Sequence, residues 1–353
     1  MFDQPPQSVC ILRLSAIGDV CHTLAVVRTL QQAWPQTRFT WIIGKLEAKL
    51  LGHLPDIEFI VFDKKAGLDA YRNLRRQLRG RSFDVLLHMQ IALRASLIAW
   101  LVRARIKLGF DRARAGELQW LFSNRKIVEN INQQVLDGLF GFAEYFGVTE
   151  RKLQWDVPLT QDAEDHAHRL IPDSQPTLII SPCSSHALRN WRAEYYALIA
   201  DYAIERFGMR VMLCGGRSEL ELQTGKQIAG CMRHACDNLI GKDTLLQLLA
   251  TLKRATVLLS PDSGPGHMAT MANTPVIGLY AATRVKRCGP YLSQQWCTDK
   301  FNEAARIFKN TAPENIPWTR KIEVAGVMDL ITPDEVKQKL DALMAHRVAT
   351  KPV

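Results

Sequence analysis

Four short segments of the 353-residue sequence combine glycine or serine with side chains that can move a proton or bind an anion. They span residues 14–22, 181–191, 214–219 and 259–269. Each comes at the end of an apolar run that predicts a buried strand. Because ligands of parallel α/β sheets bind outside the carboxyl ends of the strands, these segments are the candidate site loops.

Asp19 is the candidate general base. In the segment LSAIGDVCH (14–22), Gly18 permits a tight turn or the close approach of a ligand, and Asp19 follows where the strand meets a helix. A carboxylate at that place can take a proton from a substrate hydroxyl, and it can equally cap the helix. The segment lacks GxGxxG, so a dinucleotide fingerprint is not supported.

The segment LSPDSGPGHMA (259–269) predicts an anion site, because a strand leads through a glycine-rich turn into a helix from about residue 266. It lacks the lysine of GxxxxGK[ST], which excludes a P-loop NTPase. Asp262 would repel a phosphate, so we interpret it as a ligand of sugar hydroxyls or a helix cap. His267 either bonds a phosphate or packs in the core.

The two remaining loops offer hydroxyls, a cation and an acid. Ser184 and Ser185 are hydroxyl donors, and Arg189 carries a permanent charge suited to a diphosphate. Glu219, in CGGRSE, is placed to accept the hydroxyls of a ribose. A solvated loop is the alternative for each segment alone, but four such strand ends together favour a ligand site.

Strand and helix patterns alternate in both halves of the chain. The predicted strands are 9–14, 39–43, 59–62, 84–88, 107–110, 177–181, 210–213, 255–259 and 276–280, and the predicted helices are 22–33, 68–78, 95–104, 193–206, 245–252 and 333–345. The polar stretch 155–176, with three prolines, is interpreted as interdomain. This order predicts an α/β protein of two doubly wound parallel sheets, domains 1–160 and 161–353, with ligands in the cleft between them. The final helix has the option of packing back on the first domain.

The net charge of +10 is concentrated in one segment. Residues 72–126 contain thirteen Lys and Arg against three Asp and Glu, and the rest of the chain is neutral. Such an excess indicates an anionic partner: a nucleic acid, an acidic membrane surface or a phosphorylated substrate. The arginines of residues 72–79 are interpreted as a membrane-facing helix surface.

The sequence also indicates in which cellular compartment the protein is expected. No apolar run approaches the ~20 residues of a spanning helix, and the N-terminus has no signal-peptide pattern. The eight cysteines are scattered, without CxxC or zinc spacing. We expect a cytoplasmic protein with reduced thiols.

At these loops the sequence resembles the ADP-heptose:lipopolysaccharide heptosyltransferases, family nine of the glycosyltransferases. The matching stretches are LSAIGDVCHTLAV, HMQIALRAS, LFSNRK, SPCSSHALRNW and PDSGPGHMATMANTPVIGLYAAT, between about residues 9 and 285. Within the family the pattern is most similar to the enzymes that add the first heptose to the Kdo of the inner core. The resemblance implies the GT-B fold, two Rossmann-like domains facing a cleft, and an inverting transfer that needs neither a metal nor a cofactor.

The resemblance also implies roles for individual residues. Asp19 falls on the catalytic base of the S-x-x-G-D motif. Arg189 stands where relatives often have Lys, and Ser263 where some have Thr. The implied donor-binding residues are Ser184, Ser185, Arg189, Glu219, Lys242, Asp262, Ser263, Gly264 and His267. The acceptor candidates of the first domain are Ser15, Gly18, Lys64, Lys65, Arg94, Arg112 and Arg114.

The expected partners are ADP-heptose, a Kdo–lipid A acceptor and the anionic inner leaflet, for a monomer on the cytoplasmic face of the inner membrane, with no nucleic acid. Three alternatives stay open. A GT-B enzyme for another nucleotide sugar or a later core heptose would share every loop. A basic nucleic-acid-binding protein would need a recognition module among the arginines, and none is evident. A non-enzymatic two-domain binding protein would normally carry an export signal.

Overall fold

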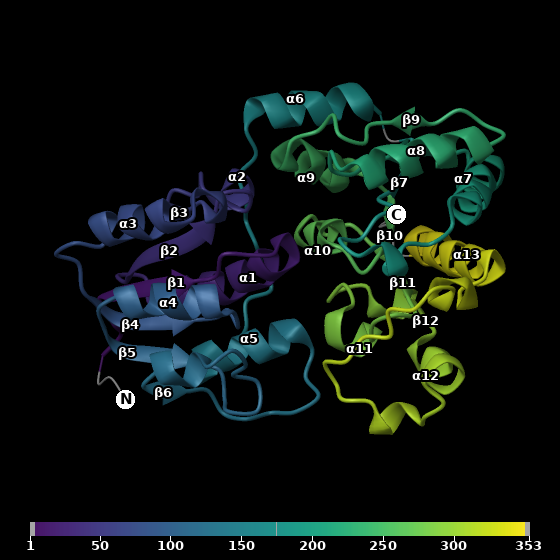
Figure 1. Cartoon of the computed structure of the whole chain (residues 1–353). Coiled ribbons are helices and arrows are strands. Elements are labelled where there is room, and N and C mark those ends of the chain that lie inside the picture. The colour runs from purple at the N-terminus through teal and green to yellow at the C-terminus, as the bar shows by residue number, and fades with distance from the viewer. Residues whose placement is uncertain (1–3, 174, 350–353) are drawn as a thin grey trace. The chain divides into compact units, whose positions relative to one another are not determined.

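The computed structural model describes residues 4–173 and 175–349, and the chain divides into two compact units, 1–158 and 159–353 (Figure 1). The division lies two residues from the boundary expected from the sequence. Each unit is built around one six-stranded parallel sheet. Within the described ranges, no helix has the length and apolar character needed to cross a bilayer.

The first unit contains a parallel sheet in the order β3-β2-β1-β4-β5-β6. Its strands are β1 (Ser8–Leu12), β2 (Arg38–Gly44), β3 (Ile57–Phe62), β4 (Phe83–His88), β5 (Ala104–Gly109) and β6 (Arg125–Lys126). The chain adds β2 and β3 on one side of β1, and it then crosses back to place β4 on the other side of β1. This reversal makes the sheet doubly wound, as the sequence predicts, and places the topological switch point between β1 and β4.

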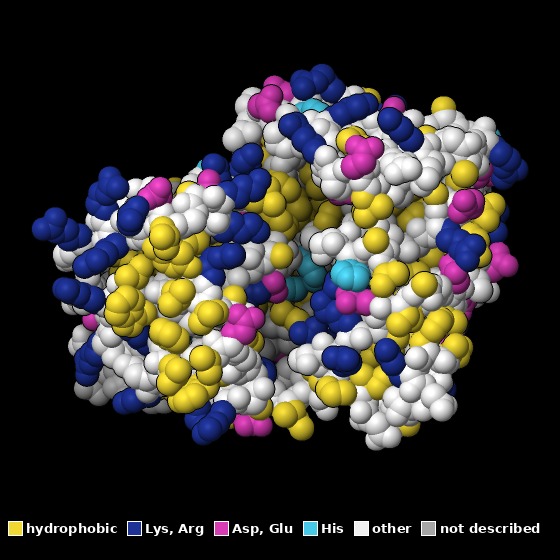
Figure 2. All heavy atoms as spheres, in the orientation of Figure 1, with side chains coloured by type: hydrophobic (Ala, Val, Ile, Leu, Met, Phe, Trp, Pro, Cys, Tyr) yellow, Lys and Arg dark blue, Asp and Glu magenta, His cyan; other side chains and the backbone are white. Residues whose placement is uncertain are grey.

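The helices of the first unit are α1 (Ile17–Ala33), α2 (Ala48–Leu51), α3 (Leu68–Gln77), α4 (Leu93–Leu101) and α5 (Val135–Glu144), with short 3₁₀ turns η1 (Lys64–Ala66) and η2 (Gln119–Phe122). Helices α3 and α4 cover the same face of the sheet, because Leu74 and Ile98 join one core cluster with Cys10 and Leu86. On the outer side of α4, Figure 2 shows apolar side chains gathered on the surface.

Helix α1 begins five residues before its predicted start at residue 22. The N–H of Ala16 donates to Asp19 Oδ2 at 3.1 Å, so the aspartate carboxylate satisfies a backbone donor that the helix start leaves open. Asp19 therefore lies in the first turn of α1 rather than in a loop before it, and its side chain position is fixed by the helix.

The second unit repeats the topology, with the sheet order β12-β11-β10-β7-β8-β9 and the switch point between β7 and β10. Its strands are β7 (Thr177–Ile180), β8 (Arg210–Leu213), β9 (Asp237–Asn238), β10 (Val257–Pro261), β11 (Val276–Tyr280) and β12 (Thr298–Asp299). Its helices are α6 (Gln161–Leu170), α7 (Ala193–Phe207), α8 (Glu219–Cys231), α9 (Leu245–Arg254), α10 (Gly264–Met271), α11 (Val285–Cys288), α12 (Phe301–Lys309) and α13 (Pro333–Ala349). The 3₁₀ turns are η3 (Ala187–Arg189), η4 (Gln294–Trp296), η5 (Pro313–Asn315) and η6 (Val327–Leu330).

The interpretation of residues 155–176 as a purely interdomain stretch is wrong for its middle part, which forms α6. Thr160 caps this helix through the N–H of Ala163. Two alanines on α6, Ala163 and Ala167, pack against Ala250 of α9. A stripe of alanine alone gives a weak apolar period, which is why the pattern did not predict a packed helix.

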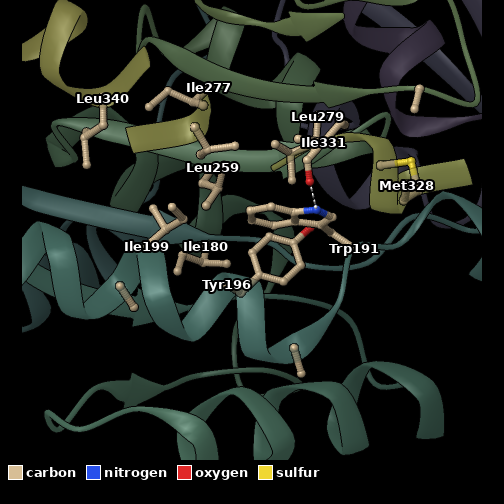
Figure 3. Close-up of a cluster of buried hydrophobic side chains, with 14 of the residues drawn as sticks. Ile180, Trp191, Tyr196, Ile199, Leu259, Ile277, Leu279, Met328, Ile331 and Leu340 are labelled. Carbon is tan, nitrogen blue, oxygen red and sulfur yellow. Dashed lines mark hydrogen bonds between the residues drawn. The ribbon is translucent and has the colours of Figure 1, made fainter. Parts of the chain in front are cut away.

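Trp191 is a large buried side chain of the second core (Figure 3). Its ring is 3% exposed, meets Tyr196 edge-on at 5.3 Å between centroids, and donates from Nε1 to the Ile331 carbonyl at 3.0 Å. The same core contains Leu340 of α13, so the final helix buries its apolar face inside the second unit. Because Trp191 follows residues 181–190 directly, the core also anchors that loop.

We predict that Trp191→Ala destabilises the second unit by about 3–5 kcal/mol, through the lost ring and the cavity that it leaves. Trp191→Phe should cost roughly 1–3 kcal/mol, because the buried Ile331 carbonyl loses its donor. Urea unfolding followed by far-UV circular dichroism measures both. The exposed Trp100, changed to Ala, is the control and should shift stability by no more than about 0.5 kcal/mol; equal effects at the two tryptophans would contradict this role.

Candidate functional site

Asp19 lies at the switch point of the first unit, just beyond the end of β1. Arg13 reaches it across the loop, with Nη2 at 2.5 Å from Asp19 Oδ2, and Arg13 Nη1 also donates to the Met89 carbonyl beyond β4. The Asp19 side chain is 33% exposed and the Arg13 side chain 12%. Arg13 thus links the carboxylate to residues after both strands that flank the switch point, and the carboxylate stays partly exposed.

The charge of Asp19 is stabilised by its surroundings. Burial opposes the charge, but the Arg13 guanidinium and the N–H of Ala16 outweigh it and hold the pKa of Asp19 below its usual range. A carboxyl with a depressed pKa adds stability that is fully present above its ordinary pKa and is lost as the pH falls through the lowered value. Asp19 is therefore an ionised acceptor of protons at neutral pH.

The loop before Asp19 is fixed by β4 and β2. The N–H of Leu14 donates to Gln90 Oε1 at 2.6 Å, and Gln90 Nε2 lies 3.4 Å from Ser15 Oγ. On the other side, Trp41 Nε1 donates to the Arg13 carbonyl at 3.0 Å. Gly44 is required at the end of β2, because a Cβ there would clash with the Leu14 carbonyl oxygen. These contacts give the base a rigid support.

A basic cavity of about 440 Å³ opens beside this loop, at the ends of β1, β2 and β3. Four of the predicted acceptor residues line it: Ser15, Lys64, Lys65 and Arg94. The structure adds two cations that the sequence analysis missed. Lys45 and Lys49 line the cavity from the segment after β2, where the order of the sheet could have indicated them. The five cations outnumber the two acidic residues of the lining, Glu47 and Asp63, of which Asp63 pairs with Lys45 at 2.8 Å. This excess of positive charge suits an anionic ligand.

Glu47 is a second carboxyl at the cavity that the sequence analysis missed. It is 7% exposed, and burial raises its pKa, with the charge of Asp19 acting in the same direction. The charge of Lys64 acts in the opposite direction. The surroundings thus shift the two carboxyls in opposite directions, lowering the pKa of Asp19 and raising that of Glu47.

Three predicted acceptor residues lie elsewhere in the first unit. Gly18 is buried within α1. Arg114 is bound into the fold by Asp111, Gln133 and the Val128 carbonyl. Arg112 is exposed and lies over the Trp120 ring at 5.8 Å. None of the three lines the basic cavity.

In the second unit, the loops at the switch point bring Arg189 and Asp262 together. Arg189 follows β7, Asp262 follows β10, and Arg189 Nη1 lies 3.5 Å from Asp262 Oδ2. A second carboxylate, 134 residues further along the chain, also contacts Arg189. Glu323 Oε1 accepts from Arg189 Nε at 2.7 Å and lies 2.6 Å from Nη2. Burial raises the pKa of Glu323, but the Arg189 guanidinium reverses the shift and holds this pKa below its usual range.

Glu323 belongs to a segment that is tied firmly to the second sheet. Its neighbour Ile322 is buried and donates its N–H to the Ala282 carbonyl at 2.8 Å. Further back, Arg284 donates to the carbonyls of Pro313 and Ile316 and stacks on the Phe301 ring at 4.0 Å. Nothing in the local sequence around Glu323 signals a site, because its role depends on this long-range anchoring.

Hydroxyl and backbone groups complete this cluster. Ser184 is buried, and its N–H donates to Asn190 Oδ1 at 2.7 Å, which shapes the loop after β7. Ser263 is the residue before α10, with its Oγ 2.7 Å from Ser260 Oγ. Helix α10 begins at Gly264, two residues before the predicted start, and His267 is buried in its first turns. Ser185 is exposed on the loop after β7.

Two predicted donor residues lie around β8 and β9. Glu219 is exposed at the start of α8, where Ser218 and Glu221 form the capping box. Glu221 Oε1 also accepts the N–H of Gly216 at 2.6 Å, so this acid shapes the loop that Glu219 was expected to serve. Lys242 is exposed and donates from Nζ to the Asn238 carbonyl at 2.6 Å.

The two units therefore offer different chemistry. The first holds an ionised carboxylate beside a cavity rich in lysine, which suits proton removal from a polyanionic ligand. The second holds an arginine, serine hydroxyls and a helix start, which suit a phosphate or diphosphate, with Asp262 suited to hydroxyls. In the described part of the chain, no group of three or more His, Cys, Asp and Glu is placed to hold a metal ion.

Known proteins are similar to this chain in sequence and in fold. The profile of glycosyltransferase family 9 (heptosyltransferase) matches residues 71–316. The lipopolysaccharide core heptosyltransferase OpsX of Haemophilus influenzae is 40% identical over 336 residues, which cover 95% of this chain and 96% of that protein. The resemblance inferred from the motifs is thereby confirmed.

Two solved structures show the fold. The glycosyltransferase family 9 protein of Veillonella parvula matches with a TM-score of 0.80 and 21% identity, over 96% of this chain and 97% of its own. Heptosyltransferase WaaC of E. coli, solved with ADP, matches with a TM-score of 0.70 and 21% identity, over 95% and 99%. Together they confirm the predicted GT-B fold class.

We predict that Arg13→Gln raises the pKa of Asp19, because the opposing effect of burial then remains without its counter-charge. The contribution of Asp19 to stability at neutral pH should fall with it. The Asp19 carboxyl resonance in ¹³C NMR, assigned with Asp19→Asn, measures the titration. Arg103→Gln removes an exposed charge from the same unit and should leave the titration unchanged; an unchanged titration in Arg13→Gln would contradict the assignment.

Proposed function

Because the chain belongs to glycosyltransferase family 9, the heptosyltransferases, we propose that it transfers heptose from ADP-heptose to a Kdo residue of the lipopolysaccharide inner core with inversion. Transfer of heptose in lipopolysaccharide core synthesis is the activity named for its relative of 40% identity. The observation that carries the finer proposal is Asp19, an ionised and oriented carboxylate beside a basic cavity.

In the proposed reaction, an acceptor hydroxyl attacks the anomeric carbon of the heptose from the face opposite the diphosphate. The new C–O bond forms while the bond to the phosphate oxygen breaks, and ADP leaves with that electron pair. Asp19 takes the hydroxyl proton. Its low pKa is sufficient, because the hydroxyl becomes strongly acidic as its oxygen bonds to carbon in the transition state. Arg13 keeps the carboxylate aimed throughout.

The second unit supplies the donor site of this proposal. Arg189, Ser184 and the N-terminus of α10 bind the diphosphate and stabilise the charge that grows as ADP leaves. Asp262 binds sugar hydroxyls, since a carboxylate repels phosphate but accepts from hydroxyl groups. The remaining donor residues carried over from the family keep their roles as proposals: Ser185, Glu219, Lys242, Ser263, Gly264 and His267. The proposal assigns the positive charge of this site to protein groups rather than to a metal.

The basic cavity of the first unit supplies the acceptor site. A Kdo carboxylate, together with a second Kdo or a phosphate, carries the multiple negative charge that Lys45, Lys49, Lys64 and Lys65 would neutralise. The proposal places the enzyme as a monomer on the cytoplasmic face of the inner membrane, where such an acceptor is anchored. No nucleic acid is involved.

We predict that Asp19→Asn lowers turnover by about 10²–10⁴-fold while ADP binding stays nearly unchanged, because the base is lost and the donor site is not touched. ADP release is followed by mass spectrometry, with ADP-heptose and truncated lipid A acceptors that carry one Kdo, two Kdo or a phosphorylated Kdo. Turnover by the wild-type protein should persist in EDTA.

Asp69→Asn is the matched control, since Asp69 is an exposed carboxylate of the same unit that pairs only with exposed Arg72 in the described contacts. It should transfer heptose at the wild-type rate. Near-normal turnover by Asp19→Asn would remove Asp19 from the role of base. Turnover with another nucleotide sugar, and none with ADP-heptose, would replace the donor of this proposal.

A second prediction concerns the charges around Arg189. Arg189→Gln should weaken ADP binding about tenfold or more, because hydrogen bonds to a charged group are lost. Glu323→Gln should tighten it, because the carboxylate competes with the diphosphate for the same guanidinium. Isothermal titration calorimetry measures both.

The nearby pair Arg192–Asp329 gives matched controls, since it is also an Arg–carboxylate contact, at 2.5 Å, but more exposed. Arg192→Gln and Asp329→Asn should leave ADP affinity as in the wild type. If Arg189→Gln bound ADP normally, or if Glu323→Gln bound it more weakly, the diphosphate would have to lie elsewhere.

A further inference from the structure

Helix α4 exposes apolar side chains along one face. Leu93, Leu97 and Trp100 recur at i, i+4 and i+7 and are 49%, 41% and 71% exposed, while Ile98 and Ala99 on the other side are buried in the core. A helix that is apolar on all sides is normally buried in a protein or a membrane. Of the exposed side chains of α4, Arg94 alone is charged, and the other three are apolar.

The turn η2 extends this apolar surface. Helix α4 and η2 lie against each other, and Trp120 and Leu121 of this turn are exposed, as is Leu118 just before it. Between them, Gln119 is fully buried and donates to the carbonyls of His88 and Gln90. One buried amide thus anchors the turn. We call the six residues Leu93, Leu97, Trp100, Leu118, Trp120 and Leu121 the α4–η2 face (Figure 2).

The backbone also holds this face outward. Leu118 has φ +60°, a left-handed conformation that large side chains rarely adopt. Its neighbour Glu117, at φ +50°, accepts the N–H of Leu93 at 2.5 Å and so ties the turn to the start of α4. A strained backbone of this kind persists only when surrounding contacts hold it, and such sites are often functional.

Basic side chains accompany the face on the same segments. Arg112 stacks over Trp120 at 5.8 Å between the guanidinium carbon and the ring centroid. The exposed cations of these segments are Arg94, Arg103, Arg105, Arg112, Arg125 and Lys126. Helix α3, with its own arginines, covers the same face of the sheet as α4. Only two acidic residues lie between Leu93 and Lys126, and both are engaged: Asp111 with Arg114, and Glu117 with the Leu93 N–H.

We propose that the α4–η2 face docks onto an anionic lipid surface, with its leucines and tryptophans in the interfacial layer and the surrounding arginines on the headgroups. Tryptophan and leucine enter the headgroup–acyl boundary, and clustered Lys and Arg add attraction to anionic lipids. Only the identity of the membrane rests on the proposed function. Arg94, next to Leu93, also lines the basic cavity, so the face begins beside the proposed acceptor site.

The test is vesicle sedimentation with the full chain, without ADP-heptose or acceptor, so its result does not depend on transferase activity. The wild-type protein should bind vesicles of phosphatidylcholine with phosphatidylglycerol, and bind pure phosphatidylcholine far more weakly. The variant Leu97→Ser/Trp100→Ser/Trp120→Ser should lose at least about tenfold in affinity, because three apolar side chains no longer leave water. The control Leu198→Ser/Leu220→Ser/Ile307→Ser changes three exposed apolar residues of the second unit and should bind as the wild type does.

A second measurement separates this proposal from the proposed function. The face variant should transfer heptose normally to a deacylated, water-soluble Kdo acceptor and poorly to an acceptor embedded in anionic vesicles. Loss of both activities, or equal vesicle binding by the face variant and the wild type, would overturn the docking surface. A third outcome would also overturn it. If the wild-type protein were a dimer in analytical ultracentrifugation, bound no vesicles, and became a monomer in the face variant, the face would join two copies of this chain.

Discussion

The reversal of strand order within each parallel sheet is the constraint on which both candidate sites depend. The chain leaves β1 and β4 in opposite directions, and it does the same after β7 and β10. Loops that diverge in this way leave the ends of the two strands uncovered, so a ligand can reach backbone and side chains there. Asp19 and Gln90 flank the first such place, and Arg189 and Asp262 flank the second. The same topology thus places the proposed base in one unit and the proposed anion site in the other.

Each site holds its main charged group against an opposite charge before any substrate is present, and the two pairs have different consequences. In the proposed reaction, Arg13 is a partner that Asp19 would keep during transfer, so the carboxylate would stay oriented and need little reorganisation. Arg189 is bound to Glu323 and Asp262, and the diphosphate of the proposed donor would have to displace at least part of these contacts. Donor binding under this proposal would exchange one anion for another on an arginine that is already fixed in place.

Residues whose positions follow from the topology could be predicted from the sequence, and residues that arrive through long-range packing could not. Asp19, Arg189 and Asp262 lie in the segments that follow apolar strands, so the alternating pattern was enough to place them near strand ends. Glu323 reaches Arg189 only because a segment far along the chain is anchored on the second sheet. Lys45 and Lys49 stand in no recognisable motif, so only the order of the strands indicates them. Helix α6 gives a weak signal because alanine offers little apolar contrast.

The α4–η2 face suggests a physical reason for the excess of Lys and Arg in residues 72–126. Arginines alone suit a nucleic acid and a membrane equally, since both are anionic. Nucleic acids bind proteins through phosphate charges and base stacking, to which exposed leucines contribute little. A lipid surface, by contrast, takes up apolar side chains and binds basic ones. The face begins beside Arg94, which lines the basic cavity. A sugar linked to lipid is the ligand class that joins an anionic headgroup to an apolar anchor, so a single acceptor would engage both features of the first unit.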